Sequence, residues 1–297
     1  MSHESIEHSF IVTSPAQLKL GNISGSVDIQ VGEEGIIHVL AVKHPGSGDA
    51  ERTTIEFLQA EDGSVSINTR FGENNWSWLW GAQVCDVEYI VKAPRLCSIN
   101  VNSVSNSLSL SGFEGNFSFK SVSGDMALQN LKGSLNVETV SGDVTSQGLV
   151  SQSHLKSVSG DINLQNSSLP KVNVKMVSGD VILQTGLSEG PYKFHSVSGD
   201  VHLLVPAASQ CDVELHSVSG DFTTNFPINQ SSQSSGKQTA RVGSGGAQVT
   251  LTSVSGDLQV ECEGEIPKVP EVNKLEILSK LENGELSVEE ALVKLNS

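Results

Sequence analysis

Seven aspartates that recur at similar spacing are the first residues in this sequence that could carry chemistry. Each follows a Ser-Gly pair, and they are Asp125, Asp143, Asp161, Asp180, Asp200, Asp221 and Asp257. Stacked carboxylates repel one another, and a hard cation such as Ca²⁺ between them relieves the repulsion. The candidate calcium ligands are Asp125, Asp143, Asp161, Asp180 and Asp200. With only one acidic residue per repeat, the default interpretation needs no metal or other cofactor: each carboxylate accepts backbone N–H bonds at its own turn.

A second set stands five residues before the aspartates: Lys120, Glu138, Lys156, Lys175, His195 and His216. This mildly basic outward stripe predicts either a groove for an anionic ligand or weak ion pairing that offsets the aspartates. His195 and His216 would add charge below about pH 6.5. We expect the two imidazoles to lie one above the other, where zinc would need a third ligand that the sequence does not offer.

All three tryptophans, Trp76, Trp78 and Trp80, fall within five residues. Exposed, they would form an aromatic loop for a protein partner, a glycan or a membrane surface. The alternative is that they cover the open end of a sheet and protect its edge strands.

The elements that must position these residues follow from the period of the sequence. The aspartates are 18, 18, 19, 20, 21 and 36 residues apart, and such a period indicates units that stack on their neighbours. Apolar residues recur six and three positions before each aspartate, and one and three after it, as in Phe119, Val122, Met126 and Leu128. We interpret all four columns as inward-facing, on two short strands per coil.

The fold class is therefore all-β: a single-domain parallel β-solenoid of about 18–21 residues per coil, with a small α-helical hairpin at the C-terminus. Two columns are expected to face outward. Gln129, Gln147, Gln165 and Gln184 form an amide ladder, and a hydroxyl ladder begins with Ser121, Thr139 and Ser157. The glycine before each aspartate is explained by a corner that needs a positive φ.

The chain divides into four segments. Residues 1–97 are an N-terminal β region with an early coil at Leu18–Ile29 and an inserted hairpin around Asp62-Gly63; residues 98–262 are the repeats. Residues 263–270 are a proline-containing linker, and residues 271–297 are the helical hairpin. The hairpin should dock or self-associate through its apolar face, which comprises Leu275, Leu278, Leu281, Leu292 and Leu295. The interval of 36 residues between Asp221 and Asp257 predicts either a long loop or a degenerate coil.

Composition narrows the choice of partners and location. The formal charge of −16 argues against nucleic acid as a partner. No signal peptide and no transmembrane run is visible, so a cytoplasmic location is expected, with peripheral envelope association as a further option. The four cysteines lie far apart, which indicates buried free thiols.

The repeated Ser-Val-Ser-Gly-Asp-Val pattern over Ile99–Val260 resembles the bacterial DUF4097 putative-adhesin family, a family of β-solenoids. Residues Leu275–Leu295 resemble the short SHOCT-like helical hairpin at one end of many such proteins. The resemblance implies adhesion-like binding, and some relatives are linked to envelope-stress responses.

A non-enzymatic binding or scaffold protein that makes protein–protein contacts is therefore the leading hypothesis. A regular prism offers ladders of side chains and not the cleft in which catalytic groups converge. The alternative is a carbohydrate-active enzyme of the parallel β-helix type. Such an enzyme needs one asymmetric cluster of carboxylates and basic residues in a surface groove.

Overall fold

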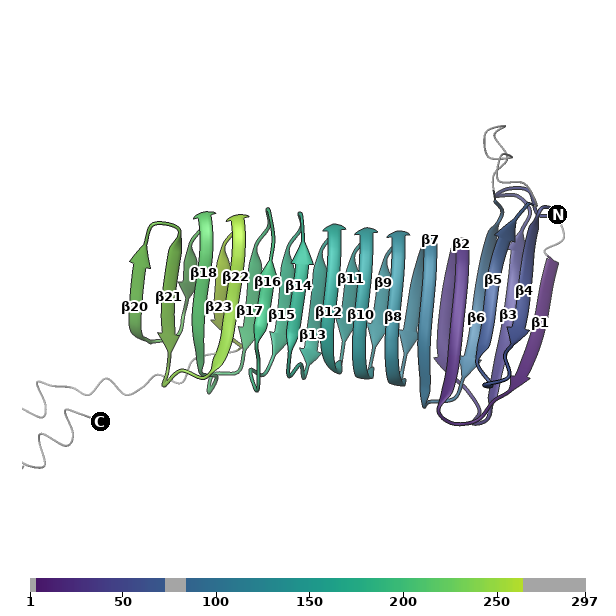
Figure 1. Ribbon diagram of the computed structural model, residues 1–297, viewed down its shortest axis with the longest axis horizontal. Coiled ribbons are helices and arrows are strands. Elements are labelled where there is room, and N and C mark those ends of the chain that lie inside the picture. The colour runs from purple at the N-terminus through teal and green to yellow at the C-terminus, as the bar shows by residue number, and fades with distance from the viewer. Residues whose placement is uncertain (1–3, 73–83, 264–297) are drawn as a thin grey trace, which may run out of the picture. The chain divides into compact units, whose positions relative to one another are not determined.

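The computed structural model describes residues 4–72 and 84–263, which form strands and no helix. They belong to one compact unit, Met1–Glu263, in which 23 strands join one hydrogen-bonded sheet. Figure 1 shows the strands side by side along the long axis, with β1 (Glu4–Ile11) at one end and β20 (Ile228–Ser234) at the other. Within the described ranges, no helix is long and apolar enough to cross a membrane.

The central coils confirm the predicted parallel solenoid with two strands per coil. The first coil is a single bent strand, β7 (Cys97–Ser111). The following coils are β8 (Glu114–Ser123) with β9 (Met126–Gln129), β10 (Lys132–Ser141) with β11 (Val144–Gln147), β12 (Val150–Ser159) with β13 (Ile162–Ser167), β14 (Val172–Met176) with β15 (Val181–Thr185), and β16 (Tyr192–His195) with β17 (Val201–Val205). Strands before the Ser-Gly-Asp corner pair in parallel in a first ladder, and strands after it pair in a second ladder.

Six strands close the N-terminal end of both ladders. They are β1, β2 (Ala16–Val31), β3 (Ile36–His44), β4 (Thr53–Gln59), β5 (Val65–Phe71) and β6 (Asp86–Ala93). Strand β2 pairs with β7 along both ladders and places Ser26 opposite Ser107. Beyond β2, the first ladder continues to β5, which pairs with the antiparallel strand β4. The second ladder continues to β6, β3 and β1.

The C-terminal coils are stacked out of sequence order. The remaining strands are β18 (Cys211–Ser219), β19 (Phe222–Thr224), β20, β21 (Lys237–Val242), β22 (Ala247–Ser255) and β23 (Leu258–Cys262). The β22–β23 coil lies between the β16–β17 coil and the β18–β19 coil. Residues 228–242 form the β20–β21 hairpin, which pairs antiparallel on β18. The 36-residue interval between Asp221 and Asp257 is thus neither a loop nor a degenerate coil. The chain forms the β20–β21 hairpin and then returns as β22 to the position next to β16, which β18 does not occupy.

Three of the four predicted apolar columns are buried, and the fourth assignment was wrong. The columns six before and one and three after the aspartates fill the core, as Phe119, Val137, Met126 and Leu128 do. The valines three before the aspartates face solvent, and Val177 is 47% exposed. Residues six and three before the corner cannot share one face of an extended strand, because side chains alternate between its faces.

The hydroxyl column lies inside, contrary to the outward placement predicted from its polarity. Ser121, Thr139 and Ser157 are each 6% exposed. Each hydroxyl donates to the carbonyl oxygen two residues on, at 2.9 Å for Ser121, 3.2 Å for Thr139 and 3.1 Å for Ser157. A small hydroxyl with a local acceptor can be buried at the corner at low cost.

All four cysteines are buried free thiols, as predicted. Burial raises the pKa of Cys97 to about 12 and that of Cys211 to about 11. Both thiols therefore stay protonated at neutral pH and act as small apolar core residues.

Candidate binding surface

The corner motif has a structural explanation that lies between coils. Gly142 has a φ of 120°, as predicted for the corner glycine. A Cβ there would also lie 2.4 Å from the carbonyl oxygen of Gly124 in the preceding coil. Gly220 and Gly256 meet the same obstacle at 2.2 Å. The corner therefore requires glycine for close stacking as well as for its backbone angle.

The aspartate side chains bond to the next coil and not, as predicted, to their own turn. The backbone N–H of Asp143 donates to Oδ1 of Asp125 at 3.0 Å, and the N–H of Asp161 donates to Oδ1 of Asp143 at 2.9 Å. The chain of bonds continues through Asp180, Asp200, Asp257 and Asp221 at 2.8–2.9 Å. One oxygen of each candidate calcium ligand from Asp125 to Asp200 is thus already engaged. Among residues 4–72 and 84–263, no three His, Cys, Asp or Glu side chains gather as a metal site.

The outward valines form a continuous apolar row that we call the valine stripe. Seven of them are 46–54% exposed, and Val218 at the C-terminal end is 85% exposed. In spatial order the stripe contains Val104, Val122, Val140, Val158, Val177, Val197, Val254 and Val218. Exposed apolar surface that runs unbroken along a protein is typical of an interaction site.

A cluster of cations lies beside the valine stripe on strands β12, β14 and β16 and on the residue before β14. We call it the cationic patch, and it comprises His154, Lys156, Lys171, Lys175, Lys193 and His195. The parallel register places Lys156, Lys175 and His195 in one row, as predicted for the outward stripe. His154, Asn173 and Lys193 form the next row.

A hollow of about 440 Å³ is lined in part by three residues of the patch, His154, Lys171 and Lys193, together with Asn173. Sequence reasoning missed Lys171, Lys193 and His154, because they lie outside the column of residues five before the aspartates. A signal was present, since residues two positions apart on a strand share a face.

The lysines on either side of Glu138 have a carboxylate partner, whereas three lysines of the cationic patch do not have one among the described residues. Glu138 bonds Lys120 at 3.0 Å and Lys156 at 3.1 Å, and these bonds lower the pKa of Glu138. Within the described part of the chain, Lys171, Lys175 and Lys193 have no carboxylate partner. Desolvation, followed by the charges of Lys156 and Lys175, lowers the pKa of His154.

His195 and His216 of the outward basic stripe are not neighbours, contrary to the prediction. Thr252 lies between them, since His195 pairs with Thr252 and Thr252 pairs with His216. His216 instead contacts Glu214 at 2.8 Å.

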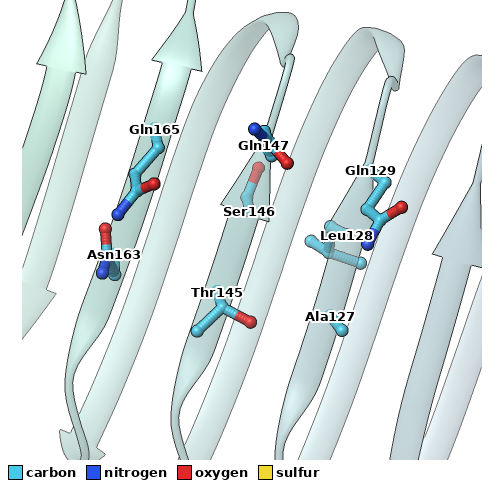
Figure 2. Close-up of a pocket in the computed structure, with 8 residues that line it drawn as sticks. All are labelled: Ala127, Leu128, Gln129, Thr145, Ser146, Gln147, Asn163 and Gln165. Carbon is cyan, nitrogen blue, oxygen red and sulfur yellow. The ribbon is translucent and has the colours of Figure 1, made fainter.

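Gln129, Gln147 and Gln165 lie in register on the second ladder but do not form the predicted amide ladder. The register shifts before Gln184, whose Oε1 accepts the backbone N–H of Asn166 at 3.2 Å. Figure 2 shows Gln129, Gln147 and Gln165 on three adjacent strands, beside Thr145 and Asn163. In this described region, the amides of Gln129, Gln147 and Gln165 make no hydrogen bond to one another. They line a shallow hollow of about 220 Å³ that contains no charged side chain.

One asymmetric cluster of carboxylates and cations lies where the β20–β21 hairpin meets β18. Asp212 bonds Arg241 at 2.7 Å, and Glu214 contacts Lys237 and His216. Hydrogen bonds from Arg241 lower the pKa of Asp212, and those from Lys237 and then His216 lower the pKa of Glu214. A glycosidase needs one carboxylic acid whose pKa is raised so that it can protonate the leaving group. The pKa values of Asp212 and Glu214 are lowered, not raised, so neither carboxylate has the property of such an acid.

Other predicted site residues lie outside the described residues. They are Trp76, Trp78 and Trp80, and the tail leucines Leu275, Leu278, Leu281, Leu292 and Leu295.

Fold and surface together define a repeat protein of the parallel β-solenoid class, with outward rows of side chains that repeat from coil to coil. The chain belongs to the Toastrack DUF4097 family, whose profile matches residues 17–261. The match extends the resemblance into the N-terminal strands. A comparison with curated proteins finds no match.

Three solved structures illustrate the similarity. A "putative adhesin" from Bacteroides fragilis NCTC 9343 is 14% identical, with 88% of this chain and 97% of that chain covered and a TM-score of 0.47. A "putative cell adhesion protein" from Clostridium sporogenes ATCC 15579 is 16% identical, with 88% and 100% covered and a TM-score of 0.26. A "putative lipid binding protein" from Parabacteroides distasonis ATCC 8503 is 9% identical, with 86% and 96% covered and a TM-score of 0.35. Similarity at this level carries no function to the present chain.

Proposed function

We propose that this protein is a non-catalytic binding protein that holds an acidic protein partner on the face formed by β12, β14 and β16. The observation that carries the proposal is the cationic patch beside the valine stripe. Three lysines without carboxylate partners in the described part of the chain gather there, on a protein with 18 Lys and Arg against 34 Asp and Glu.

The charge of the patch is opposed to that of the chain as a whole. A molecule of net charge −16 repels acidic partners over most of its surface. Lys171, Lys175 and Lys193 provide a local attractive site, so that an acidic partner is steered to one orientation.

The apolar half of the surface favours a protein over a small anion. Val158, Val177 and Val197 stand on the same outward side as the patch and are each 46–49% exposed. Covering them releases water from apolar surface, which a simple anion cannot do. A protein segment with acidic and apolar side chains would contact the cationic patch with its acidic residues and the valine stripe with its apolar residues.

The other predicted interaction elements extend this proposal. Trp76, Trp78 and Trp80 would add an aromatic contact, and the tail leucines would serve docking. We also propose, from the family resemblance, that the partner lies at or near the cell envelope.

The carbohydrate-active alternative has less support. Its required asymmetric cluster corresponds to Asp212 and Glu214, whose pKa values are lowered by their cationic neighbours. The uncharged hollow beside Gln147 offers hydrogen-bonding groups for a sugar but lacks a general acid or base among its lining residues.

The proposal is tested with a short peptide of alternating glutamate and leucine, titrated onto the full chain at several salt concentrations. Binding is expected to weaken as salt rises, because screening reduces the attraction. The triple variant Lys171→Glu, Lys175→Glu and Lys193→Glu should lose at least about ten-fold in affinity, since like charges then face each other. Val177→Ser with Val197→Ser should weaken binding without changing its salt dependence.

The matched control carries the same charge change on the N-terminal strands and the segment that follows them: Lys19→Glu, Lys92→Glu and Arg95→Glu. This variant should bind the peptide as the wild type does. Equal loss of affinity in the control would contradict the proposed site and indicate a general charge effect. Binding to anionic lipid vesicles in place of the peptide would overturn the assignment of a protein partner.

A further inference from the structure

We propose that the C-terminal end of the solenoid is a dimerisation surface, at which β20 pairs antiparallel with β20 of a second copy of this chain. The proposal rests on how the two ends of the stack differ. It is independent of the partner assigned to the cationic patch.

The N-terminal end is well capped. Phe10 packs near His8 and Phe57 there, and Phe10 is 5% exposed. Its outermost strands, β1 and β4, carry charged side chains in ion pairs: Glu4 with Lys43 at 3.2 Å, Glu7 with His38 at 2.8 Å, and Glu56 with Arg70 at 2.6 Å. Charged side chains on edge strands discourage pairing with another chain.

At the C-terminal end, the described residues cap one of the two ladders. The β20–β21 hairpin covers β18, whereas β19 pairs only with β23 among the described strands and keeps an open edge within them. Phe222 on β19 is partly exposed, although its column is at most 3% exposed from Met126 to Leu258. A hollow of about 700 Å³ also lies between the last corner and the turn of the hairpin, and it includes Val218. Apolar atoms of the last coil are thus left uncovered by residues 4–72 and 84–263.

Within the part of the chain that the structure describes, strand β20 is an unprotected edge. All seven of its residues are exposed, and among the described strands it pairs with β21 on one side only. A strand that buries no side chain and has one neighbour is marginal by itself, which suggests that a second neighbour completes it. Its sequence, Ile-Asn-Gln-Ser-Ser-Gln-Ser, contains no charged residue.

The charges favour a second copy of this chain as the partner that pairs with β20. Most surfaces of a chain with a net charge of −16 repel a copy of themselves, but the uncharged β20 does not. Antiparallel pairing of one strand with its own copy has two-fold symmetry, which closes the assembly at two chains. Glutamine and asparagine amides on the paired strands would also be able to bond across the contact.

The test is sedimentation equilibrium of the full chain over a range of concentrations. The wild type is expected to dimerise, and Gln230→Glu with Ser232→Glu should weaken the dimer at least about ten-fold, because the new charges lie opposite each other across a two-fold axis at Ser231. The matched control, Ser5→Glu with Ser9→Glu on the exposed side chains of β1, should dimerise as the wild type does. Leu278→Glu in the tail should also leave the dimer intact.

Hydrogen exchange supplies a second measurement that needs no variant. Backbone amides of β20 should exchange more slowly as the protein concentration rises, because the dimer protects them. A wild type that stays monomeric at every concentration would overturn the proposal. So would a dimer that is insensitive to the charges on β20, or one that Leu278→Glu abolishes, since either result assigns assembly to another surface.

Discussion

The backbone N–H of Asp180 donates a 2.9 Å hydrogen bond to Oδ1 of Asp161 in the preceding coil. Through such bonds the repeated carboxylate fastens each corner to its neighbour. The motif that first suggested chemistry is therefore part of the stacking of the solenoid.

Removal of one acceptor from this ladder should destabilise the stack modestly. Asp161→Ala leaves the Asp180 N–H without its partner, and we expect a loss of about 1 kcal/mol in the free energy of unfolding. Asp161→Asn keeps an acceptor oxygen and should unfold close to the wild type. Urea denaturation compares the three proteins. Equal destabilisation by both variants would indicate that the negative charge matters more than the hydrogen bond.

Calcium is not expected to raise the melting temperature. Ca²⁺ prefers six to eight oxygen ligands, whereas each carboxylate from Asp125 to Asp200 already binds a backbone N–H through one oxygen. Thermal melts of the full chain with calcium and with a chelator should coincide. A calcium-dependent rise that disappears in Asp161→Ala would restore the column as a metal site.

The exposed valine column can be tested against a buried valine three residues earlier in the chain. Val177→Asp places a charge in solvent and should change the free energy of unfolding by no more than about 0.5 kcal/mol. Val174→Asp buries a charge at a position that is 1% exposed and should cost several kcal/mol. Chemical denaturation measures both. A Val177→Asp protein that unfolds like Val174→Asp would place the valines inside.

The pKa of His154 should report the electrostatics of the cationic patch. It is lowered from its ordinary value of 6.5 by desolvation and by Lys156 and Lys175. The folded state then binds a proton less readily than the unfolded chain, so this contribution to stability is present above pH 6.5 and declines as the pH falls below it. Lys175→Gln should move the pKa of His154 upward in an NMR titration. An unchanged pKa would mean that Lys175 does not act on the imidazole.

Periodicity in the sequence by itself determined much of this fold. The coil length, the parallel stacking, the corner glycine and three inward columns follow from strand alternation and close packing. The same alternation also contained the correction for Val177 and Ser157, because residues six and three before the corner point to opposite faces. Polarity misled here, since a buried hydroxyl finds its acceptor two residues away.

Only the tertiary structure decided which coil neighbours which. Near-identical repeats offer near-identical edges, so local sequence does not distinguish β22 from β18 as the neighbour of β16. For the same reason, the sequence alone did not reveal that Thr252 separates His195 from His216. The cationic patch likewise arises from stacking, because Lys156, Lys175 and Lys193 are distant in sequence and meet only when three coils align.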